Sequence, residues 1–129
     1  MKQQLWYTDE HEWVQHTVDG TLRIGITDFA QHQLGDIVFV ELPGAGTTIG
    51  QGTEIGTIES VKTVSDLFAP VTGTVLKVNE ALESTPELVN ESPYEEGWMI
   101  EVEMSNDVEE ALGKLLSAEQ YEQLISDEQ

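Results

Sequence analysis

The chain of 129 residues contains no cysteine and only five lysine and arginine residues, against 25 aspartates and glutamates. Without cysteine it has no disulfide, no thiolate metal ligand and no cysteine nucleophile of its own. Its formal net charge of -20 repels nucleic acid and anionic membrane surfaces, because both are bound through lysine and arginine. We therefore expect neither as a partner, and we expect docking onto basic faces of other proteins.

Long apolar runs are also lacking. Residues 1–6 contain no signal-peptide core, no segment approaches membrane-spanning length, and no Arg- and Ser-rich transit segment is present. We expect a cytoplasmic bacterial protein, or a mitochondrial matrix protein if a precursor is processed. Length and ordinary apolar content predict a single folded domain over residues 1–129, and we expect a monomer.

Segments of alternating polarity, rich in β-branched residues, predict a mainly β protein. The predicted strands are 12–18, 21–26, 36–42, 53–59, 63–69, 74–79 and 97–104. Asp19-Gly20 predicts a type I′ hairpin turn between the first two strands. Many short strands with regular turns favour a small sandwich or barrel with peripheral helices. Four large residues are expected in the core: Trp13, Phe39, Trp98 and Ile100.

Helix signals are short and lie mostly near the end of the chain. Thr27 or Asp28 can cap a helix that ends before Gly35. Thr85 and Pro86 suit the start of another short helix. A C-terminal helical segment is predicted over about residues 106–126. It begins at Asn106 or Asp107 and includes a last helix with a Ser117/Gln120 capping box.

Lys62 is the residue with the clearest chemical signal. It lies between the predicted strands 53–59 and 63–69, in the sequence Glu-Ser-Val-Lys-Thr-Val-Ser-Asp. Asn-Gly, Asp-Gly and Pro, which ordinarily make hairpin turns, are absent there. An amine displayed on such a turn suits amide attachment of a carboxylic acid cofactor, because a tethered arm searches at high effective concentration. A solvated turn lysine is the alternative.

Enzymatic motifs are not evident. The glycines at 44, 46, 50 and 52 lack a following Gly-Lys-Ser/Thr, and no serine lies in a nucleophile elbow. His11, His16 and His32 lack the spacing of zinc ligands. His11 has acidic neighbours that could hold a stray cation, but we expect a solvated loop histidine. These observations favour a carrier over an enzyme.

Several sequence blocks together resemble one family. Residues 56–66, followed by Ala-Pro-Val-Thr-Gly at 69–73, are similar to the lipoyl-attachment region of glycine cleavage system H proteins. Four further blocks resemble the same family in order: 7–14, 25–30, 34–43, and 90–94 together with 97–99. The methionines that flank the lysine of biotin carriers are absent. Val61 stands where lipoyl domains of 2-oxo acid dehydrogenases usually have Asp.

The resemblance implies a lipoyl-type barrel-sandwich hybrid that carries lipoate on Lys62. A pyridoxal-phosphate glycine decarboxylase would load an aminomethyl group onto the arm, and a tetrahydrofolate-dependent aminomethyltransferase would remove it. An FAD- and NAD-dependent dihydrolipoyl dehydrogenase would reoxidise the dithiol, and lipoate-attaching enzymes would modify the lysine. The chemistry would belong to these partners. A protein that relays lipoate to other enzymes is one alternative, and an unmodified binding module is another, against which Lys62 argues.

The resemblance also implies roles for acidic residues near the arm. Glu59 belongs to the motif that attaching enzymes recognise. Glu12 and Asp66 are expected to line a cleft for the arm, with Glu10 as a third candidate. Such a cleft would exclude water from a labile aminomethyl group, and its carboxylates would favour the positive charge. The alternative for each acid is a surface carboxylate with no role.

Overall fold

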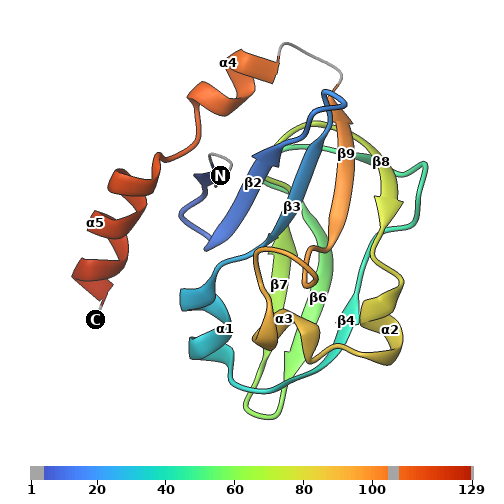
Figure 1. Cartoon of the computed structure of the whole chain (residues 1–129), viewed down its shortest axis with the longest axis vertical. Helices are drawn as coiled ribbons and strands as arrows, with labels where there is room; N and C mark the ends of the chain where they lie inside the picture. Colours follow the sequence, from blue (N-terminus) through green and yellow to red (C-terminus); the bar gives the residue numbers. More distant parts are fainter. Residues whose placement is uncertain (1–4, 105–107, 129) are drawn as a thin grey trace.

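Figure 1 shows the computed structural model, which describes residues 5–104 and 108–128. Within these residues, nine strands form two antiparallel sheets. The larger has the strand order β1-β2-β3-β9-β8-β5 and the smaller has the order β4-β6-β7. The strands are β1 Leu5–Tyr7, β2 Glu12–His16, β3 Leu22–Ile26, β4 Ile37–Glu41, β5 Thr48–Ile49, β6 Glu54–Ser60, β7 Val64–Phe68, β8 Gly73–Val78 and β9 Ile100–Met104.

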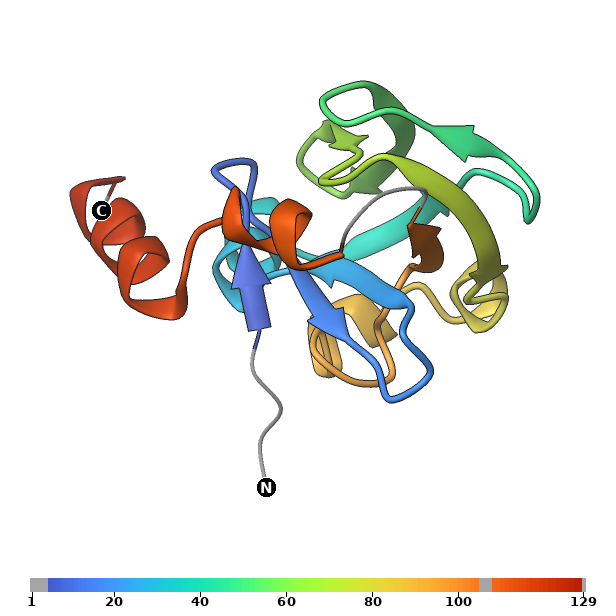
Figure 2. The ribbon, with the colours of Figure 1, turned by 90° about the horizontal axis from the view of Figure 1, so that it is seen from above.

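The helices are short and lie at the periphery of the sheets. They are α1 Asp28–Leu34, α2 Ala81–Ser84, α3 Leu88–Glu91, α4 Val108–Gly113 and α5 Ala118–Glu128. Figures 1 and 2 show α4 and α5 outside the sheets, with α5 beside the N-terminal strand. The expected mainly β architecture with peripheral helices and a C-terminal helix is confirmed. Among the described residues, no helix has the length and apolar character needed to cross a membrane.

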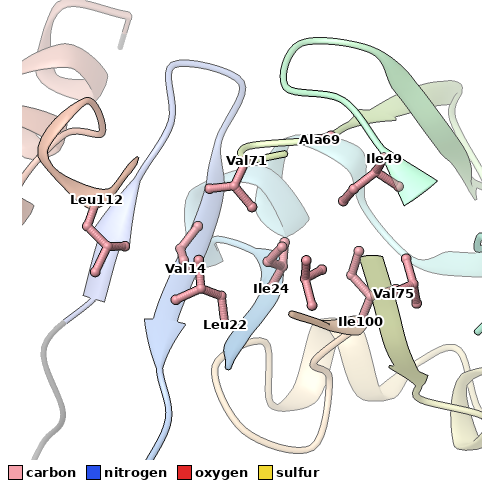
Figure 3. Packing of buried hydrophobic residues seen from close by; sticks show 10 residues of the cluster. Val14, Leu22, Ile24, Ile49, Ala69, Val71, Val75, Ile100 and Leu112 are labelled. Atoms are coloured by element: carbon pink, nitrogen blue, oxygen red, sulfur yellow. The ribbon is translucent and has the colours of Figure 1, made fainter. Parts of the chain in front are cut away.

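Two apolar clusters hold the sheets together. The first lies on the larger sheet and reaches α4 through Leu112 (Figure 3). The second lies between the smaller sheet, α2 and α3, and includes Ile58, Leu67 and Val89. Trp13 is fully buried, and its indole N–H donates to the Pro93 carbonyl at 2.9 Å. This anchor holds β2, and with it the neighbouring Glu12, in place.

Local sequence patterns predicted most helix and strand boundaries correctly. Thr27 caps α1 by accepting the Ala30 amide, and Gly35 ends it with a positive φ of 82°. Ser117 and Gln120 form the predicted capping box at 2.9 and 3.2 Å. Asn106 and Asp107, the predicted helix start, lie outside the described residues.

Five expectations about the fold were wrong. Trp98 is only half-buried, and the Arg23 guanidinium lies 4.7 Å from its ring centroid. Between β2 and β3 only Gly20, and not Asp19, has positive φ, so the turn is not type I′. Thr85 closes α2, a helix that was not predicted, and does not begin the next one. The last predicted strand begins at Ile100, three residues late. Phe39 is 49% exposed because the register of β4 shifts between Ile37 and Phe39, which turns its ring outward.

Candidate functional site

Lys62 is exposed on the turn that joins β6 to β7. The Ser60 side chain organises this turn: its hydroxyl oxygen accepts the amides of Lys62 and Thr63 at 3.2 and 3.1 Å. The backbone closes it with a bond from the Ser60 amide to the Thr63 carbonyl at 2.8 Å. A serine at the start of a turn can thus replace the missing Asn-Gly. Ser60 was visible in the sequence, but no role was predicted for it.

A second segment holds the crest of the hairpin from the side. The Val61 amide donates to the Asp36 carbonyl at 3.0 Å, in the link between α1 and β4. Figure 1 shows this link passing beside the β6–β7 turn. The methylene stem of Lys62 lies over Gly35, where an added Cβ would be 3.3 Å from Cε of the lysine. The stem therefore passes over the C-terminal end of α1.

Asn90 fastens this link to the rest of the fold. Its Oδ1 accepts the Ile37 amide at 2.8 Å, and its Nδ2 donates to the Gly35 carbonyl and to the Gln31 side chain, both at 2.9 Å. The side chain of Gln31 is itself buried. Asn90 is therefore a positioning residue for the Lys62 turn, reached from α3. The sequence resemblance included Asn90 but gave it no role.

A groove of about 150 Å³ runs beside α1 and β7. Leu34, Gln33 and Ala30 form its α1 side, and Ser65 and Leu67 form its β7 side. The other lining residues are Glu10, His11, Glu12, Ile26, Ile58 and Asp66. The three acids predicted to line a cleft thus come together here. Among the described residues that line the groove, none is lysine or arginine.

Glu12 is the buried acid of the groove, with only 2% of its surface exposed. Its Oε2 accepts the Phe68 amide at 2.9 Å, and its Oε1 accepts the Thr8 hydroxyl at 3.3 Å. Burial raises the pKa of the Glu12 carboxyl from 4.5 to about 8, although both hydrogen bonds act in the opposite direction. Near pH 7 the carboxyl is therefore largely protonated, and it becomes a carboxylate readily when a cation is near.

The other predicted acids are less enclosed. Asp66 and Glu10 are exposed at the margin of the groove. Asp66 alternates along β7 with Ser65 and Leu67, so its side chain shares the outward face of the strand with Val64. Glu59 lies outside the groove, opposite Val64 in the adjacent strand.

His11 is half-buried. The expectation that it is a solvated loop histidine was therefore wrong. Its φ is 66°, and its Nδ1 lies 2.8 Å from the Tyr121 hydroxyl. The same hydroxyl lies 2.7 Å from Oγ1 of Thr27, the cap of α1. Helix α5 therefore supports the groove wall from behind. Nothing local in the sequence signals this contact, because the residues are 110 positions apart. No metal-binding cluster of His and acidic residues occurs in the described ranges.

Glu12→Gln should raise the free energy of unfolding at alkaline pH. The Glu12 pKa is about 8 in the folded state and 4.5 without the fold, so its contribution to stability is complete below pH 4.5 and is lost as the pH rises through about 8. The variant should lack this decline and exceed the wild type by up to a few kcal/mol at high pH. Urea unfolding at acid and alkaline pH tests this, with Glu103→Gln as the control for loss of one exposed charge. Parallel curves for wild type and Glu12→Gln would contradict it.

Asn90→Ala should loosen the Lys62 turn. The change leaves the Ile37 amide and the buried Gln31 side chain without these partners, which costs about 1–3 kcal/mol. Hydrogen exchange at the Val61 amide should become faster by more than the drop in the global free energy of unfolding accounts for. Asn90→Asp keeps the acceptor for Ile37 and should show a smaller effect. If Val61 exchange merely follows global stability in both variants, Asn90 does not position the turn.

Comparison with known proteins finds one family along nearly the whole chain. The family model described as Glycine cleavage H-protein matches residues 5–128. The chain is 58% identical over 127 residues to the glycine cleavage system H protein of Oceanobacillus iheyensis, covering 98% of each. It is 60% identical over 122 residues to that of Listeria monocytogenes serotype 4a, covering 94% of each.

A solved structure has the same fold. The crystal structure of a glycine cleavage system H protein from Mycobacterium marinum matches with a TM-score of 0.86 and 39% identity, covering 98% of this chain and 99% of that one. The expected lipoyl-type barrel-sandwich hybrid is therefore confirmed. Sequence and fold agree over nearly the whole chain, and the protein belongs to the glycine cleavage H-protein family.

Proposed function

We propose that this protein is the lipoyl carrier of a glycine cleavage system, with lipoate joined by an amide bond to Nζ of Lys62. The observation that carries the proposal is the exposed lysine, fixed on an organised turn beside a groove that contains a buried carboxyl group. Family membership supports the carrier role. The protein supplies attachment and shelter, and it is not itself an enzyme.

The residues present fit a long acyl arm. The lysine stem starts over Gly35 at the end of α1, and the groove continues along Leu34, Gln33 and Ala30 of the same helix. Helix α1 has seven residues and rises about 10 Å. A lysine stem extended by an acyl chain is long enough to follow it. Glu12 lies farther along this path, near the start of α1. The backbone carbonyl of its neighbour His11 accepts the amide of Thr27, the residue that caps this helix.

The chain's own residues would act by binding and by excluding water. Lipoate on Lys62 would supply a dithiolane whose S–S bond opens as one sulfur takes up the aminomethyl group of glycine and CO2 leaves, and the dithiol left after release of that group would be reoxidised by the dehydrogenase. The apolar lining, including Ile58 and Leu67, would keep water from a group in the groove. Glu12 would give up its proton to pair with a cation there, and Asp66 and Glu10 would add negative charge at the margin.

Four kinds of partner follow from this function. They are a pyridoxal-phosphate glycine decarboxylase, a tetrahydrofolate-dependent aminomethyltransferase, an FAD- and NAD-dependent dihydrolipoyl dehydrogenase, and lipoate-attaching enzymes. The net charge of -20 supports docking to basic faces of these proteins.

Lys62→Arg should abolish attachment while leaving the fold intact, because arginine keeps the charge but offers no ordinary acylation site. Wild-type protein incubated with lipoate, ATP and a lipoate ligase should gain a lipoyl mass increment that maps to Lys62. Lys77→Arg, which changes another exposed lysine, is the matched control and should be modified like the wild type. A wild type that gains no increment would overturn the proposal. Lipoyl transfer to other proteins without glycine turnover would instead favour the relay alternative.

Glu12→Gln combined with Asp66→Asn should shorten the lifetime of the amine on lipoylated, glycine-charged protein. Loss of a charge-assisted hydrogen bond predicts an increase of about tenfold in its hydrolysis. Ammonia release without aminomethyltransferase and tetrahydrofolate measures this rate. The wild-type advantage should grow as the pH rises through about 8, where Glu12 becomes a carboxylate. Equal rates for the double variant and the control Glu103→Gln would refute a sheltering role.

A further inference from the structure

Exposed apolar side chains gather around Lys62. Among the described residues, seven large apolar side chains are substantially exposed, and four of them lie on the hairpin or the strand beside it. We call these four the Lys62 patch: Val38 (53% exposed), Phe39 (49%), Val61 (67%) and Val64 (58%).

The sheet register places most of this patch on one face. Phe39 in β4 lies opposite Glu59 in β6, and Glu59 lies opposite Val64 in β7. Residues directly opposite one another in antiparallel strands point to the same side of a sheet. The intervening row, Val40, Ile58 and Ser65, faces the other side, where Val40 and Ile58 are buried. The row of Phe39 and Val64 therefore faces outward.

An irregularity in β4 produces this exposure. The register shifts between Ile37 and Phe39, so two consecutive residues, Val38 and Phe39, are exposed between buried Ile37 and Val40. Bulges of this kind redirect side chains, often beside functional sites. Single exposed apolar residues are ordinary, but a group of them next to the proposed attachment lysine indicates a contact surface.

The patch is surrounded by acids. Glu59 lies within it, and the next outward row of the sheet contains Glu41 and Asp66. Asp36, in the link that holds the turn, is also exposed. A complementary surface therefore has an apolar centre and lysine or arginine at its rim.

We infer that the Lys62 patch is the docking surface for the enzyme that acylates Lys62, and that this enzyme presents an apolar centre with a basic rim. The inference rests on the proposed lipoyl attachment. An enzyme that acylates Nζ must bring its active site to the lysine, and so must cover the adjacent Val61 and Val64. Once the arm is attached, later partners act on its far end, so covering Val61 and Val64 is a requirement of the attaching enzyme.

The test measures lipoylation kinetics with a lipoate ligase, lipoate and ATP. Val64→Thr is nearly isosteric, and Phe39→Thr removes an exposed ring while keeping a β-branched residue in the strand. The double variant should raise the KM for the carrier about tenfold, with kcat and melting temperature unchanged. Val18→Thr, at a residue 94% exposed on the β2–β3 turn, is the matched control and should match the wild type. High salt should also raise the wild-type KM, because it screens the acidic rim.

The outcomes separate this inference from the proposed function. A wild type that accepts no lipoyl group overturns both. If the wild type is lipoylated and the KM of the double variant is within twofold of the wild-type KM, the docking surface alone is overturned. A KM insensitive to salt contradicts the basic rim. If the double variant abolishes a wild-type dimer in gel filtration and leaves KM unchanged, the patch serves a second copy of the chain and the inference is wrong.

Discussion

The hydrogen bond from the Val61 amide to the Asp36 carbonyl is the contact on which the position of Lys62 depends. A short hairpin turn without positive φ tends to splay its strands, and neither residue at the crest has positive φ. The bond to Asp36 and the Ser60 hydroxyl hold the crest in place. Asn90 extends the support to α3 through the Gly35 carbonyl. An exposed side chain is thereby displayed from a fixed backbone.

Glu12 opposes folding near pH 7, because a buried carboxyl is costly to ionise, whereas the same carboxyl ionises freely in the unfolded chain. Natural sequences retain such conflicts mainly at functional sites. In the proposed function, this conflict would let the Glu12 carboxyl stay neutral beside a neutral group and ionise beside a cation. The same burial that weakens the fold would then favour a cationic group in the groove.

Local patterns made the sequence informative about the hairpin, the cap at Thr27 and the lysine, because each depends on neighbours in the chain. Residues whose environment depends on pairing were beyond such patterns. Phe39 alternates like a core residue until the register shift turns it outward. His11 was expected in solvent because its partner Tyr121 belongs to the last helix. The prediction that Glu12 and Asp66 line the same groove came from family resemblance, since no sequence periodicity brings together residues from β2 and β7.

The bonds of Tyr121 to His11 and Thr27 also set an order for biosynthesis. The hairpin that carries Lys62 is translated well before α5, and its supports in β4 and α3 also precede that helix. The wall of the groove, by contrast, gains its contacts with Tyr121 only when α5 has left the ribosome. During synthesis, the Lys62 turn can therefore be in place before the groove beside it has this support.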